Sequence, residues 1–184
     1  MDAIVVIAGS AGGFGALRRF VTALPTRCTA SFFVVIHIGS YPSVLPSLLA
    51  RTAGLHSAFA YDVAPIEAGR IYVAPPDHHM LLEPSRVRLN QGPKVHHTRP
   101  AADPLFISAA KVFEERVIGI VLTGGGSDGA DGLRAIKEHG GTALVQRPQD
   151  ALTPSMPLSA MAAVHPDAVL SIPEIVQCVV ALCS

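Results

Sequence analysis

The feature that most constrains this chain is its opening stretch, an apolar strand that runs directly into a glycine-rich turn. Residues 3–8 form a continuous apolar run rich in Val and Ile, which favours a strand buried on both faces, as in a parallel sheet. Gly9 and Ser10 follow, and apolar residues then recur at helical spacing over residues 13–24. In open α/β sheets ligands bind at the carboxyl ends of the strands, and this is where Ser10 is expected to lie.

The glycine-rich turn after this strand permits several interpretations from the residues alone. Its glycines let the backbone approach a ligand closely, and they leave amide N–H groups free to point at an anion. The turn therefore suits either a phosphate cradle or a nucleophile, Ser10, beside an oxyanion hole. An ordinary turn between strand and helix, in which Ser10 only caps the helix, is the structural alternative.

The rest of the chain alternates short apolar runs with amphipathic segments. Further strands are predicted at residues 32–36, 59–63, 70–74, 117–122, 142–145 and 168–170, with a hairpin at 80–83 and 86–89. Further helices are predicted at residues 44–51, 156–163 and 173–182. Another is predicted to begin after Asp103, its cap, with Pro104 in its first turn, and one more is predicted to run through Leu133 up to Gly140. This alternation predicts an α/β fold with a doubly wound, mostly parallel sheet, helices on both faces and a β-hairpin insertion. Residues 1–184 are expected to form a single domain.

Composition and charge exclude several classes of protein. Lys plus Arg and Asp plus Glu number 14 each, so the charge balance gives no reason to expect nucleic acid as a partner. No apolar run reaches the roughly 18 residues of a membrane span, and the amino terminus lacks the basic region of a signal peptide. Cys28, Cys178 and Cys183 form neither a disulfide framework nor a zinc signature. We therefore expect a cytoplasmic protein with reduced thiols and no membrane insertion.

Polar side chains follow three of the predicted strands at the same edge of the sheet. Ser10 follows the first strand, His37 follows the second, and Asp128 lies in the glycine-rich loop after residues 117–122. A serine hydroxyl needs a base to take its proton, histidine matches that task in pKa, and a carboxylate fixes the imidazole tautomer. The three side chains are therefore candidates for a catalytic triad. Helix capping by Ser10 and Asp128, and a satisfied histidine at a strand end, remain the structural alternatives.

Two better-known patterns do not fit this chain. The α/β-hydrolase elbow reads G-x-S-x-G with the order Ser, acid, His, whereas here Gly9 directly precedes Ser10 and the order is Ser, His, Asp. The dinucleotide fingerprint G-x-G-x-x-G is not met, and His37 occupies the place where an acid would bind ribose. Nucleotide binding is therefore the weaker of the functional hypotheses.

Several spaced segments carry a resemblance that covers nearly the whole chain, from about residue 3 to residue 162. They read IVVIAGSAGG, VVIHIGS, GRIYVAPPDHHM and LTGGGSDGADGLRAIKEHGG, in this order. Together they resemble the catalytic domain of the chemotaxis protein-glutamate methylesterases, the CheB family. The resemblance implies hydrolysis of glutamyl γ-methyl esters on methyl-accepting chemoreceptors or a similar methylated protein, with release of methanol. It also implies deamidation of particular receptor glutamines, and no metal or organic cofactor.

The resemblance also implies site roles by motif position. Ser10 corresponds to the nucleophile, His37 to the base and Asp128 to the residue that orients the base. The oxyanion donors correspond to the backbone N–H groups of Ala11 and Gly125.

The chain departs from the family pattern beside the expected site. The family often has Thr at the position of Ala11, Met at that of Gly125 and Asn at that of Ser127. These changes favour an alternative, a catalytically weak binding or regulatory module of the same fold. The usual family member also carries an amino-terminal receiver domain, whereas this chain starts at the catalytic strand. Met1 favours a stand-alone chain without regulation in cis, for which a separate response regulator is the candidate partner.

Other polar residues near the expected edge have weaker interpretations. The pairs His78-His79 and His96-His97 suggest a metal site, but adjacent residues on a strand point to opposite faces and no carboxylate spacing supports one, so none is predicted. Arg99 lies in an RPxxD stretch with Asp103, where it borders the substrate groove or forms a local ion pair with that residue. Met156 belongs to a loop that reaches the same edge and is a further candidate for the groove.

Overall fold

A central parallel sheet organises the computed structural model, which describes residues 3–37, 43–52 and 54–183. Within these residues seven strands pair in the order β3-β4-β2-β1-β7-β8-β9, and every neighbouring pair in this sheet is parallel. The strands are β1 (Ile4–Gly9), β2 (Ser31–Ile36), β3 (His56–Phe59), β4 (Arg70–Val73), β7 (Val117–Val121), β8 (Thr142–Gln146) and β9 (Ala168–Leu170). The opening strand β1 therefore lies at the centre of the sheet, between β2 and β7.

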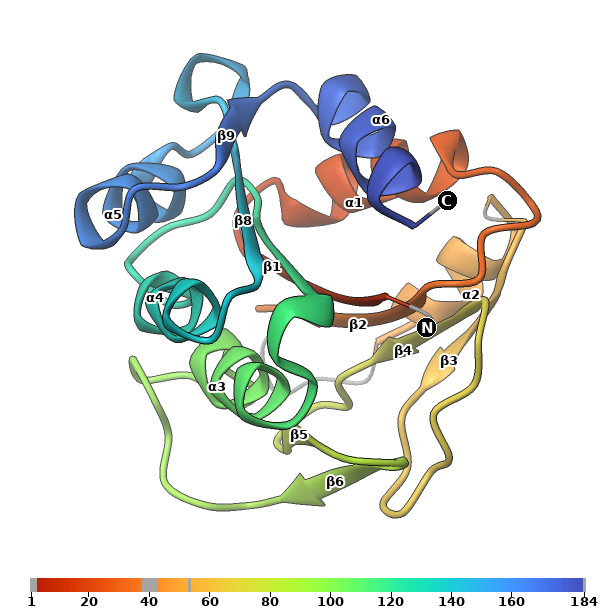
Figure 1. Cartoon of the computed structure of the whole chain (residues 1–184). Coiled ribbons are helices and arrows are strands. Elements are labelled where there is room, and N and C mark those ends of the chain that lie inside the picture. The colour runs from red at the N-terminus through yellow and green to blue at the C-terminus, as the bar shows by residue number, and fades with distance from the viewer. Residues whose placement is uncertain (1–2, 38–42, 53, 184) are drawn as a thin grey trace.

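Helices cover both faces of this sheet, as Figure 1 shows for α1 and α6 on one side and α3 on the other. The first face carries α1 (Gly13–Ala23), α2 (Leu45–Ala50) and α6 (Ile172–Leu182); the second carries α3 (Ala102–Phe113), α4 (Ala130–Glu138) and α5 (Ser155–Ala163). Short 3₁₀ turns occur at Glu114–Arg116 and Pro148–Asp150. Successive side chains of β1 alternate between the two cores, Val5 and Ile7 facing α1, Val6 and Ala8 facing α3. A strand buried on both faces has this pattern, so its continuous apolar sequence is explained.

An antiparallel hairpin interrupts the alternation of parallel strands and helices. Its strands are β5 (His79–Glu83) and β6 (Arg86–Asn90), which form a separate two-stranded sheet. The hairpin packs beside α3, where the Leu82 N–H donates to Ser108 Oγ at 3.0 Å. The predicted fold class, a doubly wound sheet with helices on both faces and a hairpin insertion, is confirmed.

One predicted strand is misplaced. The sequence predicts a strand at residues 59–63, whereas β3 ends at Phe59. The chain turns directly afterwards: the Ala64 N–H donates to the carbonyl of Tyr61 at 3.1 Å, and Val63 has a φ of 66°. A β-branched residue with positive φ interrupts extended backbone, which apolar periodicity alone does not reveal.

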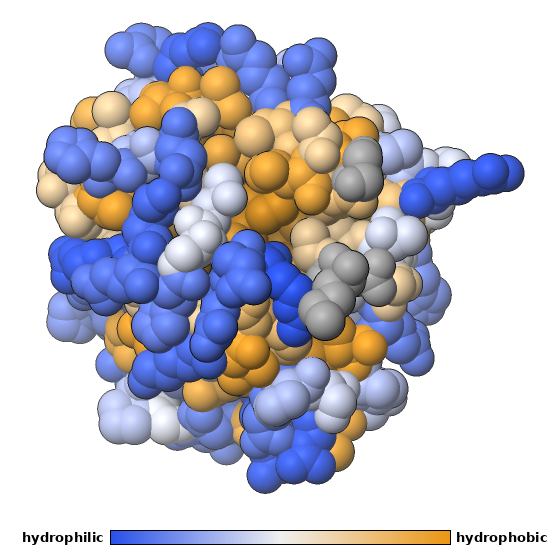
Figure 2. All heavy atoms as spheres, in the orientation of Figure 1, coloured by the Kyte–Doolittle hydropathy of each residue, from blue (hydrophilic) through white to orange (hydrophobic). Residues whose placement is uncertain are grey.

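The surface carries apolar residues between its hydrophilic groups, as the face in Figure 2 shows. Charged residues make up only 15% of the chain, and exposed large apolar side chains include Leu152 at 79% and Leu158 at 51% exposure. Across the described ranges, no helix combines the length and the apolar character needed to cross a bilayer.

Candidate active site

Ser10 lies at the carboxyl end of the central strand, where the glycine-rich turn begins. Its backbone N–H donates to the carbonyl of Thr123 at 3.0 Å, which ties this turn to the loop after β7. Gly124 makes the close approach possible, because a Cβ atom at that position would lie 2.8 Å from the Cβ of Ser10. The partly exposed Ser10 side chain therefore stands where two glycine-rich turns meet.

His37 and Asp128 form a close pair beside Ser10. His37 directly follows β2, and its N–H donates to the carbonyl of Gly9 at 3.1 Å. Gly9 is in register with Ile36, so continuing the register by one residue places His37 next to Ser10. The His37 Nε2 atom lies 2.7 Å from Asp128 Oδ2, and these side chains are 13% and 2% exposed. The structure thus brings the three predicted residues to one edge of the sheet.

The Asp128 carboxylate is held by backbone amides as well as by His37. Its Oδ2 atom accepts the Ala102 N–H at 2.6 Å and its Oδ1 atom accepts the Asp103 N–H at 3.0 Å. Burial alone would raise the pKa of this carboxyl, but the hydrogen bonds from His37, Ala102 and Asp103 together hold the pKa below its usual value. Asp128 is therefore ionised at neutral pH and fixes the orientation of the His37 ring.

Asp128 and Asp103 cap the amino termini of α3 and α4, respectively. Asp128 accepts the first N–H groups of α3, while the Oδ1 atom of Asp103 accepts the Gly129 N–H at 3.0 Å and the Gly132 N–H at 2.7 Å at the start of α4. The prediction that Asp103 caps its own helix is therefore wrong, since that residue lies inside the first turn of α3 and its carboxylate serves α4. Asp128 likewise caps α3 and not the helix that follows it. Each aspartate satisfies amides that an isolated helix would leave without acceptors.

Ser10 and His37 are neighbours without a direct bond between their side chains in the described residues. The Nε2 atom of His37 is engaged with Asp128, and Thr98 Oγ1 lies 3.5 Å from the same nitrogen. The Nδ1 atom is thus the ring nitrogen left for a hydroxyl. Catalytic hydrogen bonds are often long in the absence of substrate, so the missing hydrogen bond between the Ser10 and His37 side chains is compatible with Ser10 as the nucleophile.

The predicted oxyanion donors lie in the two glycine-rich turns. Among the hydrogen bonds of the described residues, neither the Ala11 N–H nor the Gly125 N–H is donated to a protein acceptor. By contrast, the neighbouring Gly124 N–H is donated to the carbonyl of Thr153 at 2.9 Å. The amides of Ala11 and Gly125 therefore have no protein acceptor among the described residues, as the predicted role of oxyanion donor requires.

The two groove candidates take other partners than the sequence suggests. Arg99 donates to Asp77 Oδ1 at 2.7 Å and to the carbonyls of Gln91 and Gly92, so the predicted ion pair with Asp103 is wrong. This network ties the segment before α3 to both ends of the hairpin, since Asp77 precedes β5 and Gln91 and Gly92 follow β6.

Met156 is 1% exposed, and its N–H donates to the carbonyl of Gly124 at 2.9 Å. Its contribution to the site is therefore support of the loop that carries Gly124, beneath Ser10.

Sequence reasoning missed the partners that these residues find in space. Thr98 beside His37 has no local pattern that marks it, and Asp103 pairs with His96 Nε2 at 2.7 Å. His96 lies in a tight turn, in which it and His97 have φ values of 49° and 63°, so the argument that adjacent strand residues point to opposite faces does not apply to this pair. The RPxxD resemblance and the expected helix cap both pointed to Asp103, but neither gave information about its partner.

The fold and this cluster define a class: a parallel α/β protein whose serine, histidine and aspartate gather at the carboxyl ends of the central strands. Within that class, the chain belongs to the CheB methylesterase family, whose profile matches residues 5–179.

Relatives of known name agree with this membership. A Leptospira interrogans protein, named as a candidate protein-glutamate methylesterase/protein-glutamine glutaminase, is 38% identical over 175 residues, covering 94% of this chain and 91% of that protein. Protein-glutamate methylesterase/protein-glutamine glutaminase 2 of Caulobacter vibrioides is 38% identical over 177 residues, 93% of this chain but only 51% of that protein. The crystal structure of the Thermotoga maritima CheB methylesterase catalytic domain matches with a TM-score of 0.95 and 29% identity, over 99% of both chains.

Proposed function

We propose that this protein hydrolyses glutamyl γ-methyl esters on a methyl-accepting chemoreceptor or a similar methylated protein, using Ser10, His37 and Asp128. The observation that carries the proposal is the partly buried His37–Asp128 pair, with 2.7 Å between Nε2 and Oδ2, next to Ser10 in the register of β1 and β2. Membership of the CheB methylesterase family supports the substrate class.

In the proposed reaction, the hydroxyl of Ser10 attacks the ester carbonyl carbon. His37 takes the hydroxyl proton through its free ring nitrogen and returns it to the methoxy group, which leaves as methanol. Water, activated by the same imidazole, then hydrolyses the acyl-enzyme and regenerates Ser10 and a receptor glutamate. With a glutamine side chain the leaving group is ammonia, so deamidation follows the same route.

Groups in the site are placed to stabilise the positive and negative charges that develop during these steps. Ionised Asp128 stabilises the imidazolium that forms on His37. The N–H groups of Ala11 and Gly125 are the proposed donors to the tetrahedral oxyanion, a contribution worth about 10²- to 10³-fold in rate for each donor. The reaction uses no metal or organic cofactor, and the free thiols keep the cytoplasm as the proposed location.

Replacement of the nucleophile gives the direct test. Ser10→Ala should fold like the wild type and lower methanol release from a methylated receptor fragment by roughly 10⁴-fold or more. Ser85→Ala, an exposed serine in the hairpin turn, is the matched control and should retain the full rate. Equal rates for Ser10→Ala and the wild type would remove Ser10 from the mechanism.

The second candidate function is a catalytically weak binding or regulatory module, which Gly125 favours. A Cβ atom at Gly125 would meet nothing within 4 Å, so the side chain that the family often has there is replaced by open space. A fluorophosphonate probe distinguishes the two functions. Labelling that Ser10→Ala abolishes supports an activated nucleophile, and absence of labelling in the wild type supports the binding module. Under the binding module, Gly125→Met is expected to restore labelling.

A further inference from the structure

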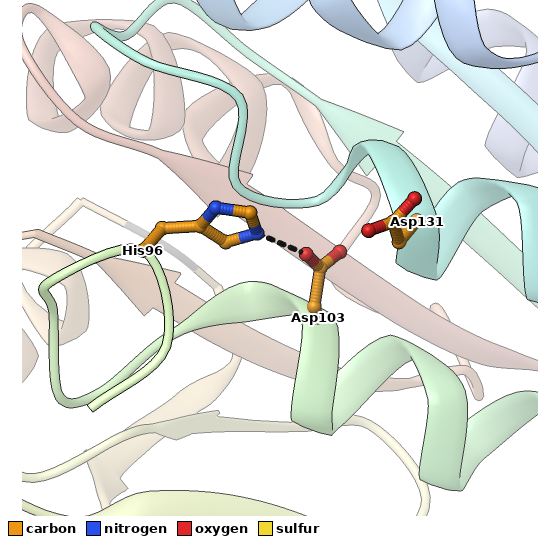
Figure 3. A group of neighbouring side chains, drawn as sticks. All are labelled: His96, Asp103 and Asp131. Carbon is orange, nitrogen blue, oxygen red and sulfur yellow. Dashed lines mark hydrogen bonds and ion pairs between the residues drawn. The ribbon is translucent and has the colours of Figure 1, made fainter. Parts of the chain in front are cut away.

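We propose that His96, Asp103 and Asp131 form a binding site for a divalent transition-metal ion of the Zn²⁺ type, separate from the esterase chemistry. The three side chains come from the turn before α3, from the first turn of α3 and from the first turn of α4. Each offers one ligand atom, and these atoms all lie within 4.8 Å of one another. Figure 3 shows His96 and Asp131 on either side of the Asp103 carboxylate.

The donor set selects this class of cation. One imidazole nitrogen with two carboxylate oxygens suits Zn²⁺ and its neighbours among the transition metals, whereas Mg²⁺ and Ca²⁺ prefer oxygen ligands throughout. Three protein ligands leave a fourth tetrahedral position for water. Ligand atoms of a tetrahedral zinc ion stand about 3.3 Å apart at ordinary Zn–N and Zn–O distances. Binding therefore lengthens the 2.7 Å separation of His96 and Asp103 and shortens separations of up to 4.8 Å, and the exposed side chains of His96 and Asp131 make this adjustment.

The Asp103 carboxylate is buried and held in one orientation by hydrogen bonds, as metal-binding carboxylates usually are. Its side chain is 5% exposed, and its Oδ1 atom is fixed by the N–H groups of Gly129 and Gly132. The Oδ2 atom is thereby aimed at His96, 2.7 Å away. Hydrogen bonds that orient a ligand's second oxygen are a regular feature of protein metal sites.

The local charge also favours a cation. The carboxylates of Asp103 and Asp131 lie beside His96, and the Asp128 carboxylate accepts the backbone N–H of Asp103, so negative charge gathers at this point. Only one cationic side chain is paired with a ligand among the described residues, since Arg134 Nη1 lies 2.9 Å from Asp131 Oδ1. That pair is exposed and is worth at most about 1 kcal/mol, so it can yield to a metal ion.

Binding exchanges a proton for the metal ion. In the structure, the hydrogen bond between His96 Nε2 and Asp103 Oδ2 holds one proton between the two atoms. Zn²⁺ takes that place, and the nitrogen and the oxygen each bind the ion. The displaced proton moves to Nδ1 of a neutral ring, or to solvent from a ring that already carries a proton on Nδ1, so that His96 binds as a neutral imidazole. Asp131 completes the set after it gives up Arg134.

The experiment titrates ZnCl₂ into metal-free full-length protein by calorimetry, or by competition with a chromophoric chelator. The wild type should bind one zinc ion per chain. His96→Ala and Asp131→Asn should each lower the zinc affinity by at least about tenfold. His97→Ala is the matched control, because this exposed neighbour lies in the same turn and is not part of the group of possible metal ligands among the described residues. Its zinc affinity should equal that of the wild type.

Two further measurements keep the proposal falsifiable. X-ray absorption of the zinc-loaded wild type should show one imidazole and otherwise oxygen ligands, and MgCl₂ should produce no saturable heat. Unchanged circular dichroism of metal-free His96→Ala should show that the variant folds. Wild-type zinc affinity in both His96→Ala and Asp131→Asn, or no binding by the wild type at 100 µM ZnCl₂ (about the upper limit of a useful site), would overturn the proposal. Neither outcome depends on the esterase reaction.

Discussion

The structure contains two imidazole–carboxylate pairs of the same length that lie close together and differ in their surroundings. In both His37–Asp128 and His96–Asp103 the Nε2 and Oδ2 atoms are 2.7 Å apart, and both aspartates are almost completely buried. Asp128 caps α3, the helix that contains Asp103, and Asp103 caps α4, the helix that follows Asp128. The pairs can therefore be compared as two copies of one interaction in different settings.

The two aspartates have pKa values shifted in opposite directions. Burial raises the pKa of Asp103, and the negative charge of Asp128 adds to that effect, so the hydrogen bonds from Gly132 and His96 do not bring it back to its usual value. Burial acts on Asp128 as well, but hydrogen bonds from His37, Ala102 and Asp103 lower its pKa overall. The carboxylate with the lowered pKa, Asp128, faces Ser10 through His37. The other pair faces solvent and Asp131.

The largest expected effect is that of removing the charge beside His37. Asp128→Asn should lower methanol release by about 10² to 10⁴-fold, because a neutral amide neither fixes the required tautomer nor stabilises the imidazolium. The measurement is kcat/KM on a methylated receptor fragment. His97→Gln, an exposed neighbour, is the control and should retain the wild-type value. A loss of less than about tenfold in Asp128→Asn would show that the two pairs do not differ in the way described.

The next effect concerns stability and the other carboxylate. Asp103→Ala should lower the free energy of unfolding by about 2–4 kcal/mol, because it leaves the buried N–H groups of Gly129 and Gly132 without an acceptor. Urea unfolding at pH 7 measures this change. Asp103→Asn keeps one oxygen for those amides, so it should recover more than half of the loss. Equal losses in both variants would mean that the charge, and not the capping, stabilises the start of α4.

The pH dependence of stability should separate the two aspartates. Asp128 has a lowered pKa in the folded protein, so its stabilising contribution is present above the unfolded pKa of an aspartate, about 3.9, and is lost as pH falls through the folded value. The difference in unfolding free energy between the wild type and Asp128→Asn should therefore narrow as pH falls from 6 towards 3. For Asp103 the pKa is raised, so the unfolding free energy of the wild type should increase relative to that of Asp103→Asn as pH falls over the same range. Urea titrations at a series of pH values give both curves, and parallel curves would contradict the comparison.

The smallest expected effect is that of His96 on stability. His96→Gln, measured with a chelator present, should lower the unfolding free energy by less than about 1 kcal/mol, because the His96 side chain is 34% exposed and its ion pair is screened by water. Removal of His37, which is 13% exposed, should cost more. A larger loss for His96→Gln than for His37→Gln would reverse the ranking of the two pairs.

Much of the fold was accessible from the sequence because apolar periodicity reports burial. The continuous run of β1 predicts a strand covered on both faces, and the structure places Val5 and Ile7 in one core and Val6 in the other. The prediction of a strand at residues 59–63 failed because the chain turns there with a positive φ at Val63, whose N–H donates to the carbonyl of Val87 at 3.0 Å. A β-branched residue gives no local sign of a positive φ. The edge at which Ser10 and His37 meet followed from the rule that parallel strands share one carboxyl end.

The sequence by itself determined the parallel α/β sheet and the edge at which Ser10, His37 and Asp128 gather, because both depend on patterns local to each strand and turn. The pairing of Asp128 with His37 was among the predictions from the sequence, but only the tertiary structure decided which imidazole pairs with Asp103 and which helix each aspartate caps. Asp103 turned out to pair with His96 and to cap α4, while Asp128 caps α3 and holds His37. Hydrogen-bond partners far apart in the chain are selected by the packing of α3 against α4, and no spacing in the sequence encodes that choice.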